Sequence, residues 1–168
     1  MNKKAQFYIL TALILILIAF GLVQGTKTVQ QAKSTFAETT ENLARESAIA
    51  INQAIYSQED IDAAYLKFFR NFMAYTRTKD TQFKALYALK QGKTIIIQNQ
   101  IGETVTIKEK GTILENSANT TITAQPTITI TYRNSQYPLR FNGNEIELRI
   151  LATTQNENEK RIKTLEVG

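Results

Sequence analysis

The sequence predicts an α+β fold, in which a long N-terminal helix and a second amphipathic helix precede a head built mainly from antiparallel β-strands. Three observations indicate this class. An uncharged apolar run opens the chain and continues into a helical pattern without proline. A second helical pattern carries a stripe of aromatic residues. After Asp80 the apolar residues stop recurring every three or four positions and begin to alternate, which is typical of strands.

The composition excludes several kinds of chemistry. The chain has 168 residues and contains no cysteine, histidine or tryptophan. Without cysteine there is neither a disulfide framework nor a thiolate site, and without histidine the usual general base and the commonest metal ligand are missing. The formal net charge is +5, but lysine and arginine are scattered among acidic residues, which indicates a solvated surface. We therefore expect no cofactor, no metal and no nucleic-acid partner.

The first apolar segment predicts a membrane-spanning helix over residues 6–25. Residues 7–23 carry no charge and show no polar face, and as a helix they are about 26 Å long, close to the hydrocarbon thickness of a bilayer. Lys3 and Lys4 lie on the N-terminal side, so the N-terminus is expected in the cytoplasm and everything after Gln24 outside it. The side chains that would face lipid or neighbouring helices include Phe7, Leu10, Leu13, Ile14, Leu17, Ile18 and Phe20.

Three fates are open for this segment. A signal peptidase that cuts after Gly25 would release a soluble protein, since Val23 and Gly25 supply small residues at the required spacing. An uncleaved segment would stay as a membrane anchor. In the third fate only the residues before the apolar run are removed, and the helix is retained. The apolar run is longer than that of a usual secretion signal and the helical pattern continues beyond it, which favours a retained helix.

The motif Lys3-Lys4-Ala5-Gln6, followed by an apolar helix, resembles the class III signal of type IV pilin-like proteins, especially the archaeal version. The resemblance implies that residues 1–5 are a leader, which a prepilin peptidase removes by cutting between Ala5 and Gln6. It also implies that the retained helix lies in membrane lipid before assembly and afterwards packs against other copies in the core of a helical homopolymer. One residue departs from the pattern. Many pilins carry glutamate at the fifth mature position, which is Leu10 here.

Residues 26–80 are predicted to be an extracytoplasmic helical region. The first helix is expected to run from the membrane to about Tyr56, because apolar residues keep recurring at helical spacing and no proline interrupts them. A second helix is expected to follow Ser57, its predicted N-cap, with Glu59 and Asp60 at the positive end of the helix dipole. An aromatic stripe on this second helix indicates a packed core that folds back on the first helix or covers the sheet. It comprises Ile61, Tyr65, Phe68, Phe69, Phe72 and Met73.

Residues 81–168 are predicted to form the β-rich head, with five to seven mainly antiparallel strands. Residues 127–132 and 145–150 alternate between apolar and polar side chains, so each stretch is expected to have one face in solvent. Asn142-Gly143 is the strongest hairpin signal. Pro126 and Pro138 indicate strand starts or sheet edges, since proline cannot donate a ladder hydrogen bond.

The sequence contains no catalytic constellation. Glu145 and Glu147 would share one face of a strand, but their alternation with Ile146 and Leu148 indicates a solvent-exposed face rather than a working carboxylate pair. One surface motif stands out. Asn119-Thr120-Thr121 is an acceptor for N-glycosylation, within a polar stretch that is expected to form a loop.

These features favour a structural subunit of a type IV pilus-like filament at the cell surface, with the head facing outwards. The alternative is a membrane-anchored extracytoplasmic binding domain that does not polymerise. A secreted enzyme is the weakest hypothesis, because its site would have to be built from Asp, Glu, Lys, Ser or Tyr alone.

Overall fold

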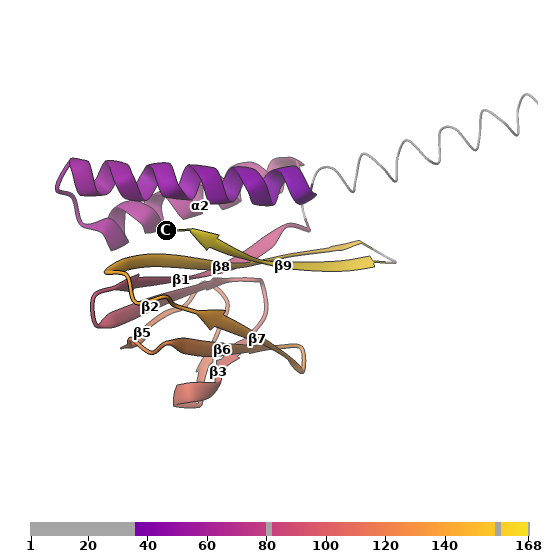
Figure 1. Cartoon of the computed structure of the whole chain (residues 1–168). Coiled ribbons are helices and arrows are strands. Elements are labelled where there is room, and N and C mark those ends of the chain that lie inside the picture. The colour runs from indigo at the N-terminus through magenta and orange to yellow at the C-terminus, as the bar shows by residue number, and fades with distance from the viewer. Residues whose placement is uncertain (1–35, 80–81, 157–158, 168) are drawn as a thin grey trace, which may run out of the picture. The chain divides into compact units, whose positions relative to one another are not determined.

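The structure is a computed structural model that describes residues 36–79, 82–156 and 159–167. The chain divides into two compact units, Met1–Glu38 and Thr39–Gly168, and the fold below is that of the second unit. The predicted leader, residues 1–5, and the predicted membrane helix, residues 6–25, lie outside the described residues. Figure 1 shows the course of the chain through the second unit.

The first helix ends at residue 56, as the sequence predicts, and is described from residue 36. Its buried positions in the second unit recur three or four residues apart, which is the spacing of one helix face. These positions are Thr40, Leu43, Ser47, Ile51 and Ala54. The helix therefore packs against the rest of the unit with one face, which these buried side chains form.

The second helix, α2 (Ile61–Lys79), begins one turn later than Ser57 and has a different cap. The backbone N–H of Glu59 donates to the carbonyl of Ala54 at 3.0 Å, and that of Gln58 donates to Ile55 at 3.2 Å. With Gln58 at φ 56°, this is a Schellman end to the first helix. Asp60 then caps α2, because its Oδ1 accepts from the N–H of Asp62 at 2.9 Å and of Ala63 at 3.2 Å. The predicted Ser57 cap is therefore wrong, since Ser57 belongs to the end of the preceding helix.

Nine antiparallel strands lie within the described residues and form two sheets. The five-stranded sheet has the order β5-β2-β1-β8-β9, and the four-stranded sheet has the order β4-β3-β6-β7. The bounds are β1 (Lys84–Gln91), β2 (Thr94–Gln100), β3 (Val105–Ile107), β4 (Thr112–Leu114), β5 (Asn119–Thr123), β6 (Thr127–Tyr132), β7 (Ser135–Arg140), β8 (Ile146–Asn156) and β9 (Glu159–Val167). A short 3-10 helix, η1 (Lys108–Lys110), joins β3 to β4.

The prediction of an α+β class with mainly antiparallel strands is confirmed, but the predicted strand number is too low. The three-residue β4 is too short to give an alternating pattern. The stretch 121–132 contributes two strands, on either side of Pro126. They are divided between two sheets, since β5 pairs with β2 while β6 pairs with β3 and β7.

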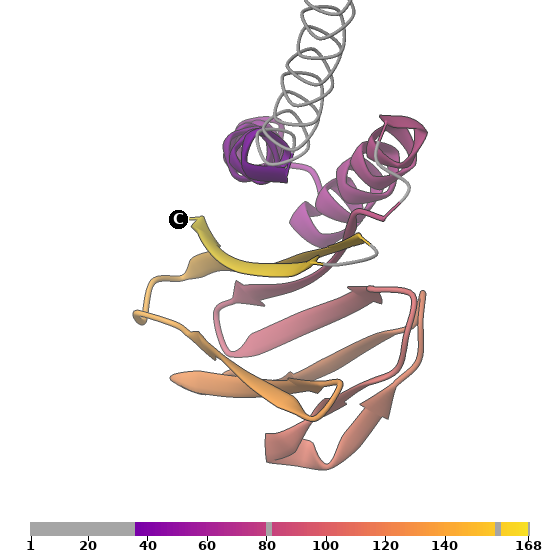
Figure 2. The same ribbon diagram turned by 90° about the vertical axis from the view of Figure 1, so that its right-hand side faces the viewer.

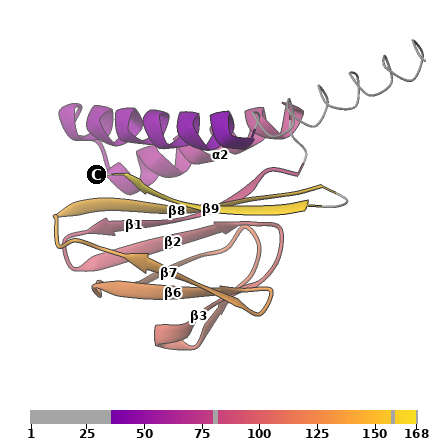
Figure 3. The same cartoon turned by 45° about the vertical axis from the view of Figure 1, so that its right-hand side comes forward.

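The second unit has three layers, with the helices on one face of the five-stranded sheet and the four-stranded sheet on the other (Figures 2 and 3). The ring of Tyr87 on β1 meets the ring of Tyr65 edge-on at 4.8 Å and that of Phe69 at 4.9 Å. Tyr65, Phe69 and Met73 are fully buried, so the aromatic stripe of α2 forms a packed core against the sheet, as predicted.

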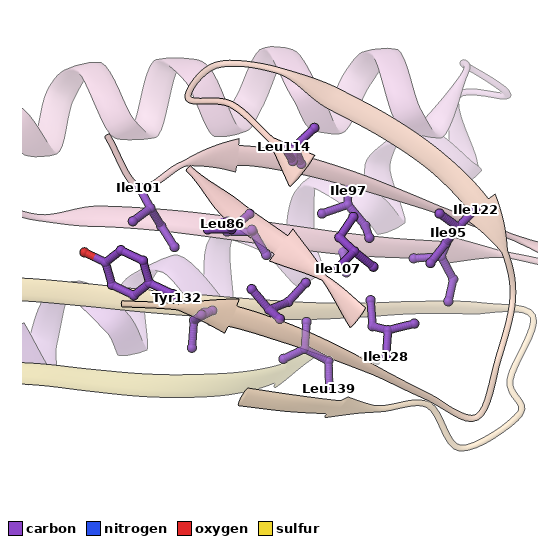
Figure 4. Packing of buried hydrophobic residues seen from close by; sticks show 14 of the residues in the cluster. Leu86, Ile95, Ile97, Ile101, Ile107, Leu114, Ile122, Ile128, Tyr132 and Leu139 are labelled. Carbon is purple, nitrogen blue, oxygen red and sulfur yellow. The ribbon is translucent and has the colours of Figure 1, made fainter. Parts of the chain in front are cut away.

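A second core fills the space between the two sheets (Figure 4). Leu86, Ile95 and Ile97 enter it from the five-stranded sheet, and Ile107, Ile128 and Leu139 enter it from the other sheet. All six are fully buried. Each such side chain stabilises the fold by about 1.5–3 kcal/mol relative to an exposed position.

Of the two stretches that were predicted to have one face in solvent, residues 127–132 and 145–150, only the first does so along its whole length. The alternation of residues 127–132 is confirmed, because every second residue of β6 is buried. The expected solvent face of residues 145–150 is wrong beyond Ile146, because every residue from Glu147 to Thr154 on β8 is buried. β8 pairs with β1 on one side and β9 on the other, so it lies inside the sheet and is covered on both faces.

The turns also differ in part from the prediction. Asn142-Gly143 does not form a hairpin, because β7 and β8 belong to different sheets and the dipeptide lies in the connection between them. The β6–β7 hairpin turns instead at Arg133 and Asn134, whose φ angles of 49° and 64° are those of a type I′ turn. Pro138 lies on β7 at a sheet edge and Pro126 directly precedes β6, as expected.

Replacing the cap of α2 tests the corrected helix start. We expect Asp60→Ala to lower the free energy of unfolding by about 1 kcal/mol, because two backbone N–H groups lose their acceptor. Ser57→Ala is the matched control and is expected to change it little. Urea unfolding of both variants, followed by circular dichroism, measures the difference. An equal loss in Ser57→Ala would contradict the assignment of the cap.

Candidate functional site

Of the side chains that the sequence marks as sites, only Asn119 lies within the described residues. Lys3, Lys4, Ala5 and Gln6 of the predicted cleavage motif, and the apolar residues of the predicted membrane helix, lie outside them. The structure instead brings together three charged side chains that the sequence did not connect. They are Lys90 on β1 with Glu147 and Arg149 on β8, and we call them the buried ion cluster.

The sheet register positions the buried ion cluster. Lys90 is the cross-strand partner of Glu147, and Ala88 is the partner of Arg149. Because Ala88 belongs to the core between the sheets, all three charged side chains lie on the face turned towards the four-stranded sheet. Their side chains are 9%, 1% and 3% exposed for Lys90, Glu147 and Arg149, so the charges are removed from water and require partners.

Both carboxylate oxygens of Glu147 are fully engaged. Oε2 accepts from the backbone N–H of Asn142 at 2.7 Å and from Nη2 of Arg149 at 2.9 Å. Oε1 accepts from the N–H of Gly143 at 2.9 Å and from Nζ of Lys90 at 3.4 Å. The carboxylate therefore holds the connection between β7 and β8 from inside the sandwich.

The two cations hold the same connection at further points. Nζ of Lys90 also donates to the carbonyl oxygen of Asn144. Nε of Arg149 donates to the carbonyl of Arg140, and its guanidinium lies 5.4 Å from the ring centre of Phe141. The buried ion cluster thus fixes residues 140–144, the segment that crosses from one sheet to the other.

The surroundings of Glu147 lower its pKa. Burial alone raises the pKa of a carboxyl, but the backbone hydrogen bonds from Asn142 and Gly143, the charge of Arg149 and the hydrogen bond from Lys90 outweigh that effect. The group is therefore ionised at neutral pH. A carboxylate that is ionised and has all its acceptor sites occupied is suited to holding a loop.

The prediction of a solvent-exposed Glu147 is wrong, whereas Glu145 is exposed as expected. The alternation of residues 145–150 fits a solvent face and a buried polar face equally well. A usable signal was the stretch Ala85–Leu89 on β1, in which apolar residues follow one another without alternation. In the structure all of these residues, and Lys90 after them, are buried. A strand covered on both faces lies inside its sheet, and its neighbours are often covered in the same way.

Two hollows lie near the buried ion cluster. A pocket of about 420 Å³ opens beside Lys90 and is lined further by Gly92, Gln125, Pro126 and Phe141. A groove of about 360 Å³ runs between the first helix and the ends of β8 and β9, and it is mainly apolar, with Ile51, Ile55, Leu148 and Val167. Within the described residues no group of three or more acidic side chains is placed to hold a metal ion.

Asn119 is exposed, but it is the first residue of β5, so the expectation that the acceptor motif lies in a loop is wrong. Its position is fixed by the neighbouring β2. The side-chain amide of Gln98 donates to the carbonyls of Ser117 and Ala118 at 3.1 and 3.2 Å. The buried amide of Asn99 donates to the carbonyls of Leu114 and Glu115 at 3.0 and 3.1 Å. The acceptor motif therefore lies on an ordered edge of the sheet.

Replacing Glu147 tests the role of the buried ion cluster. We expect Glu147→Gln to lower the free energy of unfolding by about 3 kcal/mol, because Lys90 and Arg149 are left as buried cations without a counter-charge. Glu145→Gln, two residues away and exposed, is the control and is expected to have little effect. Urea unfolding measures both. If the two variants lose the same stability, Glu147 does not hold the connection.

The lowered pKa of Glu147 also predicts a dependence on pH. A carboxyl whose pKa is lower in the folded state contributes stability above its ordinary pKa, near 4.5, and loses it as the pH falls through the folded value. The difference in unfolding free energy between the wild type and Glu147→Gln should therefore shrink as the pH falls below 4.5. Urea titrations from pH 7 to pH 3 measure this difference, and a constant difference would contradict the assigned ionisation.

No helix among residues 36–79, 82–156 and 159–167 is long and apolar enough to cross a membrane. Comparisons with family models, with curated proteins and with solved structures find no match to this chain. Its function is therefore inferred from its own residues.

Proposed function

We propose that the chain is a structural subunit of a pilus-like filament at the cell surface, with an N-terminal assembly helix and an outward-facing head. The observation that carries the proposal is the N-terminal sequence, in which Lys3-Lys4-Ala5-Gln6 precedes a charge-free apolar run over residues 7–23. A helix that must lie in lipid first and against its own copies afterwards requires such a run. The first helix of the structure, described from residue 36 to residue 56, supports the predicted continuation beyond the membrane.

The outer face of the first helix supports contacts with other copies. While its inner stripe is buried, Ile49 is 54% exposed, Ile55 is 46% exposed and Tyr56 is 91% exposed. Ile49 and Tyr56 are seven residues apart and therefore project from one side of the helix. Apolar side chains on a surface gain about 25 cal/mol per Å² when a neighbour removes them from water. The helix thus has one face for its own unit and apolar side chains available to a neighbour.

A second function is favoured by the pocket beside Lys90. It has about 420 Å³, which is within the range of small-molecule sites, and it opens among three connections between strands. A membrane-anchored binding domain that does not polymerise would use such a pocket. The two proposals differ in whether the chain is found inside filaments.

The mature N-terminus tests the first proposal directly. We expect protein purified from its own cells to begin at Gln6, because a prepilin peptidase would cut after Ala5 and leave the apolar helix in place. Mass spectrometry of the intact chain measures the start. A chain that begins at Met1 indicates an uncleaved anchor, and one that begins near Thr26 indicates a secreted protein; either result would overturn the proposal.

A charge on the outer face of the first helix tests assembly. Ile49→Glu is expected to reduce the number of filaments severalfold, because a buried carboxylate at a contact between copies would lack a partner. Asn71→Glu, an equal change of charge at an exposed position of α2, is the control. Electron microscopy of cells counts the filaments, and the thermal stability of each protein verifies that its fold is intact. Filaments that are unchanged in Ile49→Glu would remove this face from the assembly contact.

A further inference from the structure

The edge strand β5 has, in its own sequence, none of the protective features that the other sheet edges have. The two sheets have four edge strands, β5, β9, β4 and β7. An edge strand presents backbone N–H and C=O groups that a strand of another molecule can pair with, and proteins block this with proline, charge or brevity. β7 contains Pro138, β4 has three residues, and β9 carries Lys160, Arg161 and Lys163. β5 consists of Asn119-Thr-Thr-Ile-Thr123, without proline or charge.

The hydrogen bonds that flank β5 show which of its residues face outwards. Asn99 donates its N–H to the carbonyl of Ala118 at 3.0 Å, and Ala124 donates to the carbonyl of Lys93 at 2.8 Å. Along an antiparallel strand, residues alternate between bonding to the partner strand and facing away from it. The even-numbered residues of β5 therefore bond to β2, and Asn119, Thr121 and Thr123 direct their N–H and C=O groups to the open edge. In agreement, the carbonyl of Thr121 accepts from Nζ of Lys110, on η1, at 3.3 Å, so a lysine from outside the strand meets this edge at its middle residue.

The glycosylation motif coincides with this open edge. Asn119 and Thr121, the first and third residues of the motif, are both exposed and lie two apart on the strand, so their side chains project from the same face. Ile122 points the other way, into the core between the sheets. The two side chains that define the acceptor are thus accessible side by side, next to the outward backbone groups of the strand.

We propose that Asn119 is N-glycosylated and that its glycan shields the β5 edge from pairing with other copies. The donor class is an oligosaccharide carried on a lipid diphosphate. Nδ2 of Asn119 attacks C1 of the first sugar, the N–C1 bond forms, the bond from C1 to the diphosphate oxygen breaks, and the lipid diphosphate leaves as the amide loses one proton. The inference rests on the proposed function, because only an extracytoplasmic head meets this donor outside the cell membrane.

Filament assembly makes such a shield useful. Subunits that assemble through their N-terminal helices hold their heads at a high local concentration, which favours any weak pairing between exposed strands. A bulky hydrated glycan at the first residue of β5 prevents a second strand from approaching the outward groups of Asn119, Thr121 and Thr123. The glycan would therefore prevent strand pairing at β5, as Pro138 does at β7 and the basic side chains do at β9.

Glycopeptide mapping of the full-length chain purified from its own cells tests the modification. The peptide that contains Asn119 is expected to carry a sugar mass in the wild type and in Thr123→Val, which leaves the motif intact. The mass should be absent in Asn119→Gln and in Thr121→Val. An unmodified Asn119 in protein that begins at Gln6 overturns this inference while the proposed function stands. An unmodified Asn119 in protein that begins at Met1 counts against both.

Self-association of the same full-length variants in detergent tests the shield. By size-exclusion chromatography, Thr121→Val is expected to form severalfold more dimer and larger species than the wild type. Thr121→Lys also lacks the motif but places a charge on the edge, so it is expected to stay monomeric. Equal association of Thr121→Val and the wild type would overturn the shielding role even if the glycan is present. Thermal unfolding of each variant verifies that the fold is retained.

Discussion

The two central strands, β1 and β8, are covered on both faces, and the rest of the unit is arranged around them. One face takes the aromatic side chains of α2 and the inner stripe of the first helix, and the other takes the four-stranded sheet. A strand pair in this position has no side that tolerates an unpaired polar group. Charge on β1 or β8 is therefore compatible with the fold only where the structure supplies its counter-charge and hydrogen bonds.

Glu147 shows how that constraint extends into the loops. Its buried carboxylate obtains two of its hydrogen bonds from Asn142 and Gly143, so the chain that crosses between the sheets is specified by a residue inside the sandwich. Asn99 does the same at the other end of the five-stranded sheet, where its buried amide binds the segment leading into β5. In each case a polar group that must be satisfied in the interior determines the course of a surface connection.

The sequence predicted those features that depend on local patterns. The end of the first helix, the aromatic stripe of α2 and the alternation of β6 follow from residues only a few positions apart. The N-cap of α2 is three residues later than predicted. Ser57 and Asp60 are both residue types that cap helices well, but Ser57 belongs to the end of the preceding helix, so Asp60 is the cap. Asn142-Gly143 was misread because the strands on its two sides belong to different sheets, which the dipeptide alone does not reveal. Of the site, the motif at Asn119 was readable from three residues, whereas the buried ion cluster joins positions that are 57 residues apart.

The pairing of β1 with β8 has a consequence for the order in which the chain folds. β1 is the first strand made and β8 is the last but one, so the middle of the five-stranded sheet cannot close until most of the chain has emerged. Contacts between distant parts of a sequence form slowly, because the entropy of closing the loop is lost before the contact is gained. The strands between them pair with one another or with β1, so they can form before β8 arrives, whereas the pairing of β1 with β8 has to wait for it. A chain that ended before β8 would leave β1 paired on one side only, so the last two strands decide when the five-stranded sheet closes.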